Sequence, residues 1–334
     1  MSAPKISVII PLYNAEKYIR QCLISVLASK FADYEVVLVD DCSTDNSLAE
    51  VEKLLPHFGG RLKIFRTEKN SGGAGIPRNI GIKNSAGKYI TFIDNDDMLL
   101  PTALDDFFNV AEEFQADVVY AEKIFVVDED APIHIENFRS ISATAVEELI
   151  VVPALESSEL RERIRRDIAR KFFILPWGKF YRREFLIENK IDFPQMQMAE
   201  DLTFCFKCLC LAKKYVRIPH MTNIHRERKI SGGNVPGTVQ SNLQSWLNLF
   251  LTNMSILDKF MSGLEFFRAN PDVQRDVLNH YIGVHFEMIS ATFYGLKPHE
   301  VQKNFFEALQ NPALNQHGKN LVAAYFCAEK VLTR

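Results

Sequence analysis

The sequence Tyr89-Ile90-Thr91-Phe92-Ile93-Asp94-Asn95-Asp96-Asp97 is an apolar run that ends in three closely spaced carboxylates. The apolar half predicts a buried strand. Carboxylates crowded at a strand end repel one another, so a bound cation would stabilise them. Ligands bind at the carboxyl ends of parallel strands, and oxygen ligands of this kind suit Mg²⁺ or Mn²⁺ with a phosphorylated substrate. The alternative is an acidic turn that caps a helix beginning near Pro101.

Outward from this stretch, the first half of the chain alternates short β-branched runs with amphipathic segments, which is the pattern of βαβ units. The expected fold class is therefore α/β, with a Rossmann-like, mostly parallel sheet flanked by helices. The expected strands are 5–11, 34–39, 62–66, 89–93 and 117–127. The expected helices are 15–29, 47–58, 75–84 and 101–114.

Polar residues follow three of these strands, in segments 11–14, 40–45 and 94–97. Right-handed crossovers place the carboxyl ends of parallel strands on one edge of the sheet. We therefore expect the three segments to converge in space, although they are far apart in the sequence.

The pattern changes beyond Asp128. A segment over 145–171 ends in a strongly charged run from Leu160 to Lys171. Its interspersed acids favour a solvated helix face, and contact with anionic phospholipid or a lipid-diphosphate acceptor is the alternative. From about Gln240 the sequence is almost entirely helical, with an apolar stripe that predicts a core or an oligomer face. The stripe contains Trp246, Leu249, Phe250, Met254 and Leu257.

Composition, net charge and cysteine content narrow the class of protein to be expected. The 334 residues are 47% apolar and 24% charged, which is typical of a folded domain with a substantial core. A net charge of −3 gives no reason to expect a nucleic-acid partner. No run reaches the roughly 18 apolar residues of a membrane span, so we expect a cytoplasmic protein, with peripheral contact at the inner face of the membrane as the alternative. The six scattered cysteines predict reduced thiols rather than disulfides or a zinc site.

Taken in order, the motifs over about residues 5–232 resemble the family-2 glycosyltransferases. These are inverting enzymes of the GT-A fold that transfer a sugar from a nucleotide-diphosphate donor. The motifs that carry the resemblance are Ser7–Asn14, Glu16–Ile19, Val39–Asp45, Asn70–Gly73, Pro77–Gly81, Gly87–Asp97, Trp177–Arg183, Ala199–Phe204 and His225–Ser231.

The resemblance implies a donor site at the strand ends. A nucleobase needs a hydrogen-bonding partner at its edge and a flat apolar partner at its face, and Asp41 and Tyr13 offer these. Helix capping is the alternative for Asp40 and Asp45. The glycine-rich run 71–75 lacks the Lys-Ser/Thr of a P-loop and predicts a tight connection near the nucleotide. The donor-binding residues implied for this half are Pro11, Tyr13, Asn14, Glu16, Asp41, Arg78, Asp94 and Asn95.

Asp94-Asn95-Asp96 matches the acid-x-acid motif of the family. The resemblance implies that Asp96 binds Mn²⁺ or Mg²⁺, while Asp94 contacts the ribose or a metal-bound water. The ion would act as a Lewis acid that neutralises the charge on the leaving nucleoside diphosphate. Asp97 either adds to the metal site or caps the next helix, and His225 is either a second metal ligand or a structural or phosphate-contacting residue.

Inversion requires one base that takes the proton from the acceptor hydroxyl. Glu200-Asp201 matches the Glu-Asp pair of the family, which implies that Asp201 is this base and that Glu200 assists it. The alternative is that both acids complement the dipole of a helix that begins there.

The resemblance also implies that Trp177 and Lys179 form a wall of the sugar and acceptor site, and that Arg226 and Arg228 bind the donor diphosphate. Guanidinium groups match phosphate oxygens well. The sequence departs from the family at 229–233, where Lys-Ile-Ser-Gly-Gly replaces the usual Gly-Ser-Ile-Ser.

We therefore expect a metal-dependent inverting glycosyltransferase that moves a sugar from a nucleotide-diphosphate donor, a UDP-sugar, to a hydroxyl of a glycan or lipid-linked glycan in surface polysaccharide synthesis. The alternative is a catalytically inactive nucleotide-sugar-binding module or scaffold. An NAD-dependent oxidoreductase is excluded because the first strand lacks the glycine fingerprint. The expected organisation is a nucleotide-sugar-binding half over 1–128, an acceptor-binding half over 129–234, and a helical region over 235–334 that is open to homo-oligomer formation.

Overall fold

The computed structural model of the chain forms two compact units. One contains Met1–Gln197 and Phe204–Arg228, and the other contains Met198–Thr203 and Lys229–Arg334. The expected halves 1–128 and 129–234 thus share one unit, apart from Met198–Thr203 and the residues after Arg228, which belong to the other unit. The residues that the structure describes are 3–143, 148–196, 199–228 and 243–292, with isolated positions up to 319.

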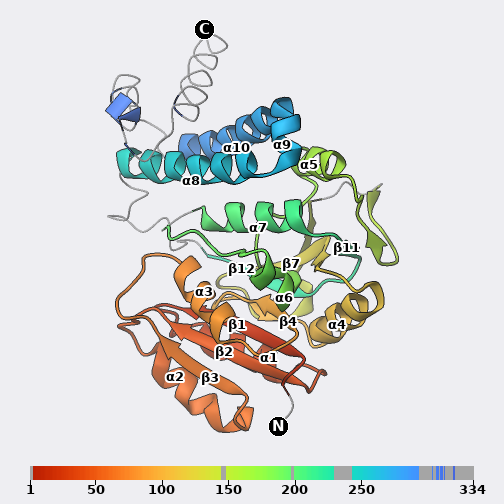
Figure 1. Ribbon diagram of the computed structural model, residues 1–334. Helices are drawn as coiled ribbons and strands as arrows, with labels where there is room; N and C mark the ends of the chain where they lie inside the picture. Colours follow the sequence, from red (N-terminus) through yellow and green to blue (C-terminus); the bar gives the residue numbers. More distant parts are fainter. Residues whose placement is uncertain are drawn as a thin grey trace. The chain divides into compact units, whose positions relative to one another are not determined.

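The first unit is built on an eight-stranded sheet (Figure 1). Its strands are β1 (Ile6–Leu12), β2 (Tyr34–Asp40), β3 (Leu62–Arg66), β4 (Tyr89–Phe92), β6 (Val118–Ala121), β9 (Ala154–Leu155), β10 (Lys179–Arg182) and β11 (Tyr215–Ile218). Their order is β3-β2-β1-β4-β10-β6-β11-β9. The first four are parallel, whereas β10 lies antiparallel between β4 and β6. The four leading strands of the α/β fold therefore end at one edge, as the sequence predicted.

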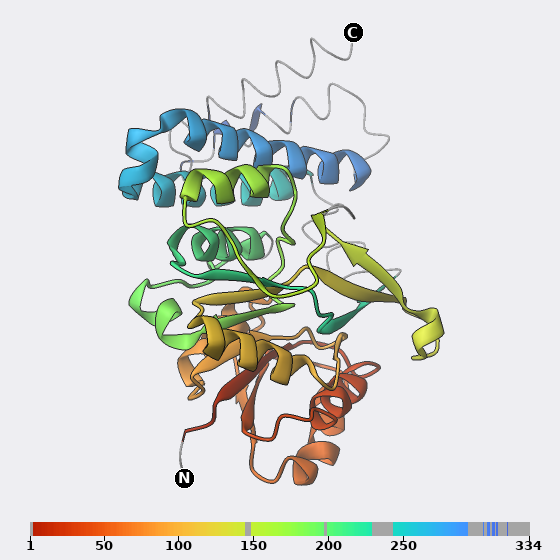
Figure 2. The same cartoon turned by 90° about the vertical axis from the view of Figure 1, so that its right-hand side faces the viewer.

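Helices cover both faces of this sheet (Figures 1 and 2). They include α1 (Ile19–Leu27), α2 (Ser47–Leu54), α3 (Gly75–Asn84) and α4 (Ala103–Phe114). Successive side chains of a strand point to opposite faces, and Ile6, Val8 and Ile10 share a core with residues of α1, α2 and α4. On the other face, Gly81 of α3 is so close to Ile9 that an added Cβ would lie 2.3 Å from the Cγ2 of Ile9. A residue without a side chain is thus what allows α3 to approach the sheet.

A second, four-stranded sheet has the order β5-β12-β7-β8. Its strands are β5 (Met98–Leu99), β7 (Lys123–Asp128), β8 (Arg139–Ser142) and β12 (Asn223–Glu227). The single strand expected over 117–127 is therefore wrong, because the chain changes from one sheet to the other at Glu122. The buried carboxylate of Glu122 accepts the N–H of Ile150 at 3.2 Å and lies 3.6 Å from Nη1 of Arg217. These long-range partners hold the chain at the point where it leaves the first sheet.

The charged run contributes α5 (Leu160–Ile168), which is followed by α6 (Arg183–Glu188) and α7 (Glu200–Leu211). Arg165 and Glu162 pair at 2.8 Å on the exposed side of α5, as expected of a solvated face. Arg163, however, is buried and donates to the carbonyl of Ala212 at 2.7 Å. The solvated face is thus one side of α5, and Arg163 belongs to the buried side, where its guanidinium binds a carbonyl of the protein interior.

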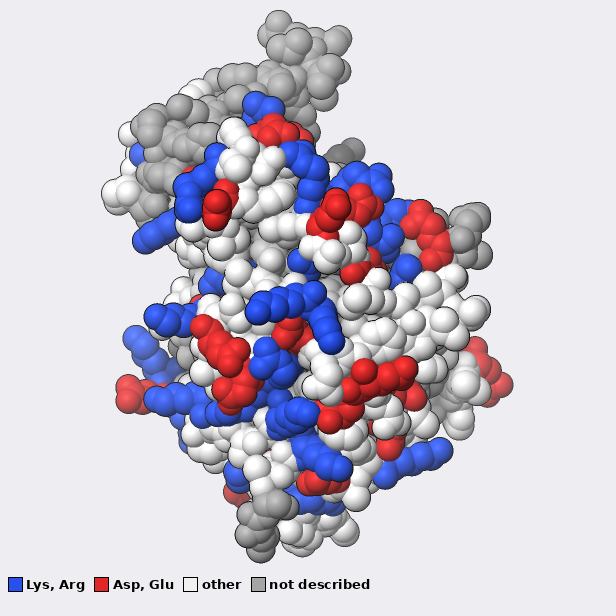
Figure 3. Space-filling model, turned by 45° about the vertical axis from the view of Figure 1, so that its right-hand side comes forward, with Lys and Arg blue, Asp and Glu red and all other residues white. Residues whose placement is uncertain are grey.

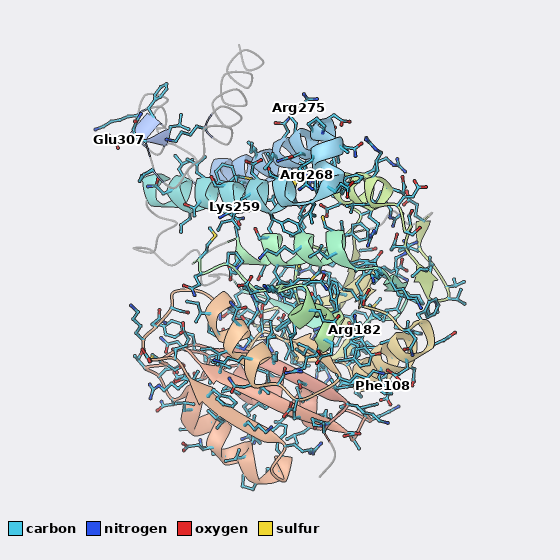
Figure 4. The ribbon with its side chains drawn as sticks, viewed as in Figure 1. Phe108, Arg182, Lys259, Arg268, Arg275 and Glu307 are labelled. Carbon is cyan, nitrogen blue, oxygen red and sulfur yellow. The ribbon has the colours of Figure 1, made fainter. Side chains whose placement is uncertain are left out.

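The second unit contains α8 (Leu243–Gly263), α9 (Glu265–Ala269) and α10 (Pro271–Thr292). The predicted stripe forms core here, because Phe250, Met254 and Leu257 are buried. The side chain of Trp246 and most of the expected helix beyond residue 292 lie outside the described residues. Three exposed basic side chains of these helices are labelled in Figure 4: Lys259, Arg268 and Arg275. Arg268 donates from Nη1 to the carbonyl of Gly263, at the end of α8, at 2.8 Å.

The described surface carries acidic and basic side chains intermingled, as Figure 3 shows for one face. Among the residues that the structure describes, no helix combines the length and hydrophobicity that a membrane crossing requires. Five of the six cysteines are described, and all five are free thiols, as expected. The sixth, Cys327, lies outside the described residues.

Candidate donor site

The predicted convergence of the strand ends is confirmed. The side-chain amide of Asn95 donates to the carbonyl of Pro11 at 3.0 Å. The backbone N–H of Thr44 donates to Oδ1 of Asn14 at 2.8 Å. The loops that follow β1, β2 and β4 are therefore joined directly by hydrogen bonds.

Asp41 and Tyr13 both lie at this edge. The carboxylate of Asp41 is buried and accepts hydrogen bonds from the hydroxyl of Thr67 at 2.8 Å and from the N–H of Ser71 at 2.9 Å. Asp41 thus holds the glycine-rich connection against the end of β2. The ring of Tyr13 is 46% exposed, which leaves a flat surface open to a ligand. Recognition of a nucleobase by this pair stays a prediction.

Glu16 and Asp45 link the end of β1 to the start of α2. Glu16 accepts the backbone N–H of Asn46, the residue that precedes α2, at 3.0 Å. Asp45 accepts the N–H of Glu16 at 3.0 Å and that of Ser47 at 3.0 Å. Asp45 and Glu16 therefore both accept backbone N–H groups at the start of α2, as the capping alternative for Asp45 expects, although Asn46 occupies the N-cap position itself.

Each of two acids in the turn after β4 faces one guanidinium. Nη2 of Arg78 lies 2.7 Å from Oδ1 of Asp94, and Nη1 of Arg228 lies 3.2 Å from Oδ2 of Asp96. Arg78 is buried beneath the turn. Burial raises the pKa of Asp96 to about 7, and the negative charges of Asp97 and Asp94 add to this effect although Arg228 opposes it. The three carboxylates of the turn therefore disfavour one another's charged form, even with two guanidinium groups in contact.

Asp97 faces His225, which lies 128 positions later in the sequence. Strand β12 pairs antiparallel with β5, with Ile224 opposite Met98, so that His225 comes opposite Asp97. Nδ1 of His225 lies 3.0 Å from Oδ1 of Asp97. Burial acts to lower the pKa of His225, but the hydrogen bond and the charge of Asp97 outweigh it and raise the pKa. The imidazole also stacks on Trp177, with ring centroids 5.0 Å apart.

Arg226, the next residue of β12, is buried among protein acceptors. Its Nε donates to the carbonyl of Asp96 at 3.1 Å, and its Nη1 donates to the carbonyl of Glu129 at 3.4 Å. Its Nη2 donates to Oε1 of Gln21 at 2.6 Å. Only 4% of the residue is exposed. Arg226 therefore holds the acidic turn against α1, and of the two arginines Arg228 has the more accessible guanidinium.

The sequence did not single out three residues of this network. The ring of Tyr18 lies 5.3 Å from the guanidinium of Arg226 and 5.5 Å from that of Arg228, and its hydroxyl donates to Glu129. Tyr18 belongs to a motif that carried the resemblance, which was a usable signal. Nothing in the local sequence around Glu129 or Gln21 indicated a part in the site.

The two residues predicted to wall the sugar site are both buried. Trp177 packs with Ile124 of β7 in a small core. Nζ of Lys179 donates to the carbonyls of Phe173, at 2.7 Å, and Leu175. The structure thus gives Lys179 a structural part in the loop before Trp177. Its place in a wall of the sugar and acceptor site stays a prediction. A charged group can be held in the interior because two carbonyls replace its hydration.

Glu200 and Asp201 form the first turn of α7, as predicted. Glu200 is buried and Asp201 is partly exposed. Both belong to the second unit, whereas the acidic turn belongs to the first. The alternative of dipole complementation also fits their position at a helix N-terminus.

The described residues contain no group of three or more His, Cys, Asp or Glu side chains that could by itself hold a metal ion. The acidic turn nevertheless suits a cation that arrives with a diphosphate. Burial and the negative charges of Asp97 and Asp94 raise the pKa of Asp96. A bound cation would offset the repulsion between these carboxylates. Carboxylate and phosphate oxygens together form the ligand set that Mg²⁺ and Mn²⁺ prefer. Asp96, with Asp94 or His225, therefore fits the expected group.

Residues 7–188 match the model of glycosyl transferase family 2. The chain belongs to this family. It is 35% identical over 213 residues to the poly(ribitol-phosphate) beta-N-acetylglucosaminyltransferase TarS of Staphylococcus aureus, a match that covers 63% of this chain and 33% of TarS. It is 33% identical to the poly(ribitol-phosphate) beta-glucosyltransferase of Bacillus spizizenii over 63% of this chain and 30% of the relative. The matched region is thus about a third of each relative.

The fold of this family-2 member is that of a solved relative. A crystal structure of S. aureus TarS 1-349 in complex with UDP-GlcNAc matches with a TM-score of 0.70 and 26% sequence identity, over 95% of this chain and 84% of that chain. The match confirms the predicted GT-A fold with a helical C-terminal region.

Proposed function

We propose that this chain is a metal-dependent inverting glycosyltransferase that moves a sugar from a UDP-sugar to a hydroxyl of a glycan or lipid-linked glycan. The observation that carries the proposal is the acidic turn after β4, in which Asp94 and Asp96 each keep one guanidinium in contact at the edge where the strand ends converge. A site with both acids and arginines can hold a diphosphate and its counter-ion together. The UDP-GlcNAc complex of the structurally similar TarS supports this choice of donor.

On the donor side, Arg228 would bind the diphosphate and Arg78 would keep Asp94 in place. A divalent ion, when bound, would stabilise the charge that develops on the leaving diphosphate. Asp96 would hold it, together with Asp94 or with Nε2 of His225, since Nδ1 of that residue faces Asp97.

On the acceptor side, Asp201 would take the proton from the acceptor hydroxyl. The oxygen then forms its bond to the anomeric carbon from the face opposite the leaving group. The bond from that carbon to the diphosphate oxygen breaks, and the nucleoside diphosphate departs with the electron pair, so the configuration inverts. Glu200 would assist by binding the acceptor or by supporting the base.

For the acceptor we propose a hydroxyl-rich polymer of bacterial surface polysaccharide type. Two relatives are named for poly(ribitol-phosphate), which makes that polymer the first acceptor to test. The alternative of a nucleotide-sugar-binding module predicts donor binding without turnover on any acceptor.

The test is a panel of UDP-sugars with Mn²⁺ or Mg²⁺, in which binding, hydrolysis and transfer to poly(ribitol-phosphate) are measured. Asp201→Asn should abolish transfer and leave UDP binding nearly unchanged, whereas Asp96→Ala should remove the metal dependence of UDP binding. Asp192→Asn is a matched control, because this exposed acid pairs with Lys207. Equal loss of binding and turnover in Asp201→Asn would contradict its role as the base, and a panel without binding or hydrolysis would overturn the whole proposal.

A further inference from the structure

A carboxamide of the C-terminal helices spans the first turn of α7. Asn253 of α8 donates from Nδ2 to the carbonyl of Ala199 at 3.0 Å. Its Oδ1 accepts the hydroxyl of Thr203 at 2.6 Å. The two partners lie immediately before and after the segment that begins with Glu200 and Asp201. All of these residues belong to the second unit.

Asn253 is fully buried, with 0% exposure, as is Thr203. Its neighbours along α8 include the buried side chains of Leu251, Met254 and Leu257. A polar group in such a core is destabilising unless its hydrogen bonds are satisfied. An aliphatic side chain would bury similar surface without that requirement. What the carboxamide adds is therefore the pair of bonds to the turn.

The backbone at Ala199 needs this support. Its φ of 62° lies in the left-handed region, which a residue with a Cβ adopts only at a cost. Ala199 directly precedes Glu200 and Asp201, so its backbone angles set the direction in which the helix starts. A hydrogen bond to the Ala199 carbonyl and another to Thr203, one turn later, fix both ends of that segment.

We propose that Asn253 is a positioning residue for sugar transfer. It holds the backbone at Ala199, and thereby the carboxylate of Asp201, in the arrangement that proton removal requires. The helical C-terminal region thus takes part in the reaction through its contact with the base-bearing turn. The inference rests on the catalytic part proposed above for Asp201.

The test uses the full chain and the variant Asn253→Leu, which removes both hydrogen bonds and keeps an apolar side chain of similar size in the core. We expect kcat for transfer from UDP-GlcNAc to fall by about tenfold or more, because a small displacement of a catalytic group is costly. The KM for UDP-GlcNAc should change by less than about twofold, since donor binding does not depend on the base. An unchanged kcat, or equal changes in kcat and KM, would overturn the inference.

Two further variants separate positioning from loss of stability. Thr203→Val removes one of the two bonds and should lower kcat less than Asn253→Leu does. Ala199→Gly in the Asn253→Leu background should restore part of kcat, because glycine adopts positive φ without a Cβ clash. Absence of any recovery would contradict the part assigned to the Ala199 backbone. Thr252→Val is the matched control with unchanged kcat, because the Thr252 hydroxyl bonds within α8 to the carbonyl of Asn248 at 2.7 Å.

A measurement without turnover distinguishes this inference from the proposed function. In protein labelled with ¹³C-alanine, Asn253→Leu should shift the Ala199 backbone carbon resonance and Thr252→Val should not. If Asp201→Asn transfers sugar as well as the unsubstituted protein, the proposed function fails while this resonance still reports on the turn. If Asp201→Asn is inactive but Asn253→Leu changes neither kcat nor the resonance, the positioning role alone is wrong.

Discussion

Asp97 and His225 are separated by 128 positions in the sequence, yet Oδ1 of the aspartate lies 3.0 Å from Nδ1 of the histidine. The pairing of β5 with β12 builds this contact, and the N–H of Arg226 donates to the same carboxylate at 2.9 Å. A fully buried acid next to two other acids is destabilising by itself. Hydrogen-bond donors from β12, a strand that comes late in the chain, stabilise this buried carboxylate.

We expect Asp97→Ala to lower the free energy of unfolding by about 2–4 kcal/mol, because it leaves the His225 imidazole and the Arg226 N–H without their acceptor. In a double-mutant cycle with His225→Ala, measured by urea denaturation, the coupling energy should be about 1–3 kcal/mol. Asp128→Ala is a control, since this acid is exposed and should cost less than about 0.5 kcal/mol. Additive effects of the two single substitutions would show that the contact carries no coupling.

The two arginines of β12 and its continuation should respond differently to replacement by lysine. Arg226→Lys should destabilise the protein by about 1–3 kcal/mol, because one ammonium group cannot reach the three acceptors that the guanidinium serves. Arg228→Lys should cost less than about 1 kcal/mol in stability but should weaken UDP binding. Denaturation and UDP titration of both variants test this. The reverse pattern would mean that Arg226 is the diphosphate ligand.

Removal of the charge at Arg228 should have opposite effects on the affinities for Mn²⁺ and for UDP. Without UDP, Arg228→Gln should bind Mn²⁺ several-fold more tightly, because the guanidinium no longer competes for Asp96. The same variant should bind UDP more weakly, since it lacks a phosphate partner. Calorimetric titrations measure both affinities. Arg139→Gln is the control, as Arg139 pairs with Asp128 and Glu227 on the surface. Weaker Mn²⁺ binding in Arg228→Gln would refute the competition.

The helical unit should lose stability in mild acid. Burial lowers the pKa of His285 to about 4, from an ordinary value near 6.5, although its hydrogen bond to the carbonyl of Tyr281 opposes the change. A depressed histidine pKa means that the folded protein binds fewer protons than the unfolded chain. The stability is therefore fully present above about pH 6.5 and falls as the pH drops toward 4, by about 2 kcal/mol at pH 5.

This pH dependence is checked by urea unfolding at pH 7.5 and 5. The difference between the free energies of unfolding at the two pH values should be smaller in His285→Gln, because glutamine does not titrate. His134→Gln, at an exposed position, should leave this difference unchanged. Equal pH dependence in all three proteins would show that His285 does not contribute to it.

Local patterns predicted the first half of the fold well. The strand at 62–66 and the helix at 75–84 have the observed bounds, because alternation and helical periodicity are properties of neighbouring residues. The break at Glu122 and the insertion of the antiparallel β10 were not predicted. Both depend on pairing with segments about 60 to 100 residues away, such as the β11 and β12 strands, and no short window of sequence contains that information.

The site was predicted in part for the same reason. Converging strand ends follow from topology, so the approach of Asn95 to Pro11 could be expected. The direction in which a long cationic side chain points could not be expected from the sequence. Lys179 and Arg226 have the chemistry of phosphate ligands, but carbonyl oxygens of the protein satisfy the same donors, and only the fold shows which acceptor is nearer.

The pairing of β12 with β5 also limits how the molecule can be divided. The family match ends at residue 188, but the partners of the acidic turn stand at 225–228. A fragment cut at 188 would keep Arg78 beside Asp94, but it would lack the His225, Arg226 and Arg228 side chains that contact Asp97 and Asp96. We therefore expect a chimera that exchanges the first half of the chain between relatives to need β12 from the same parent.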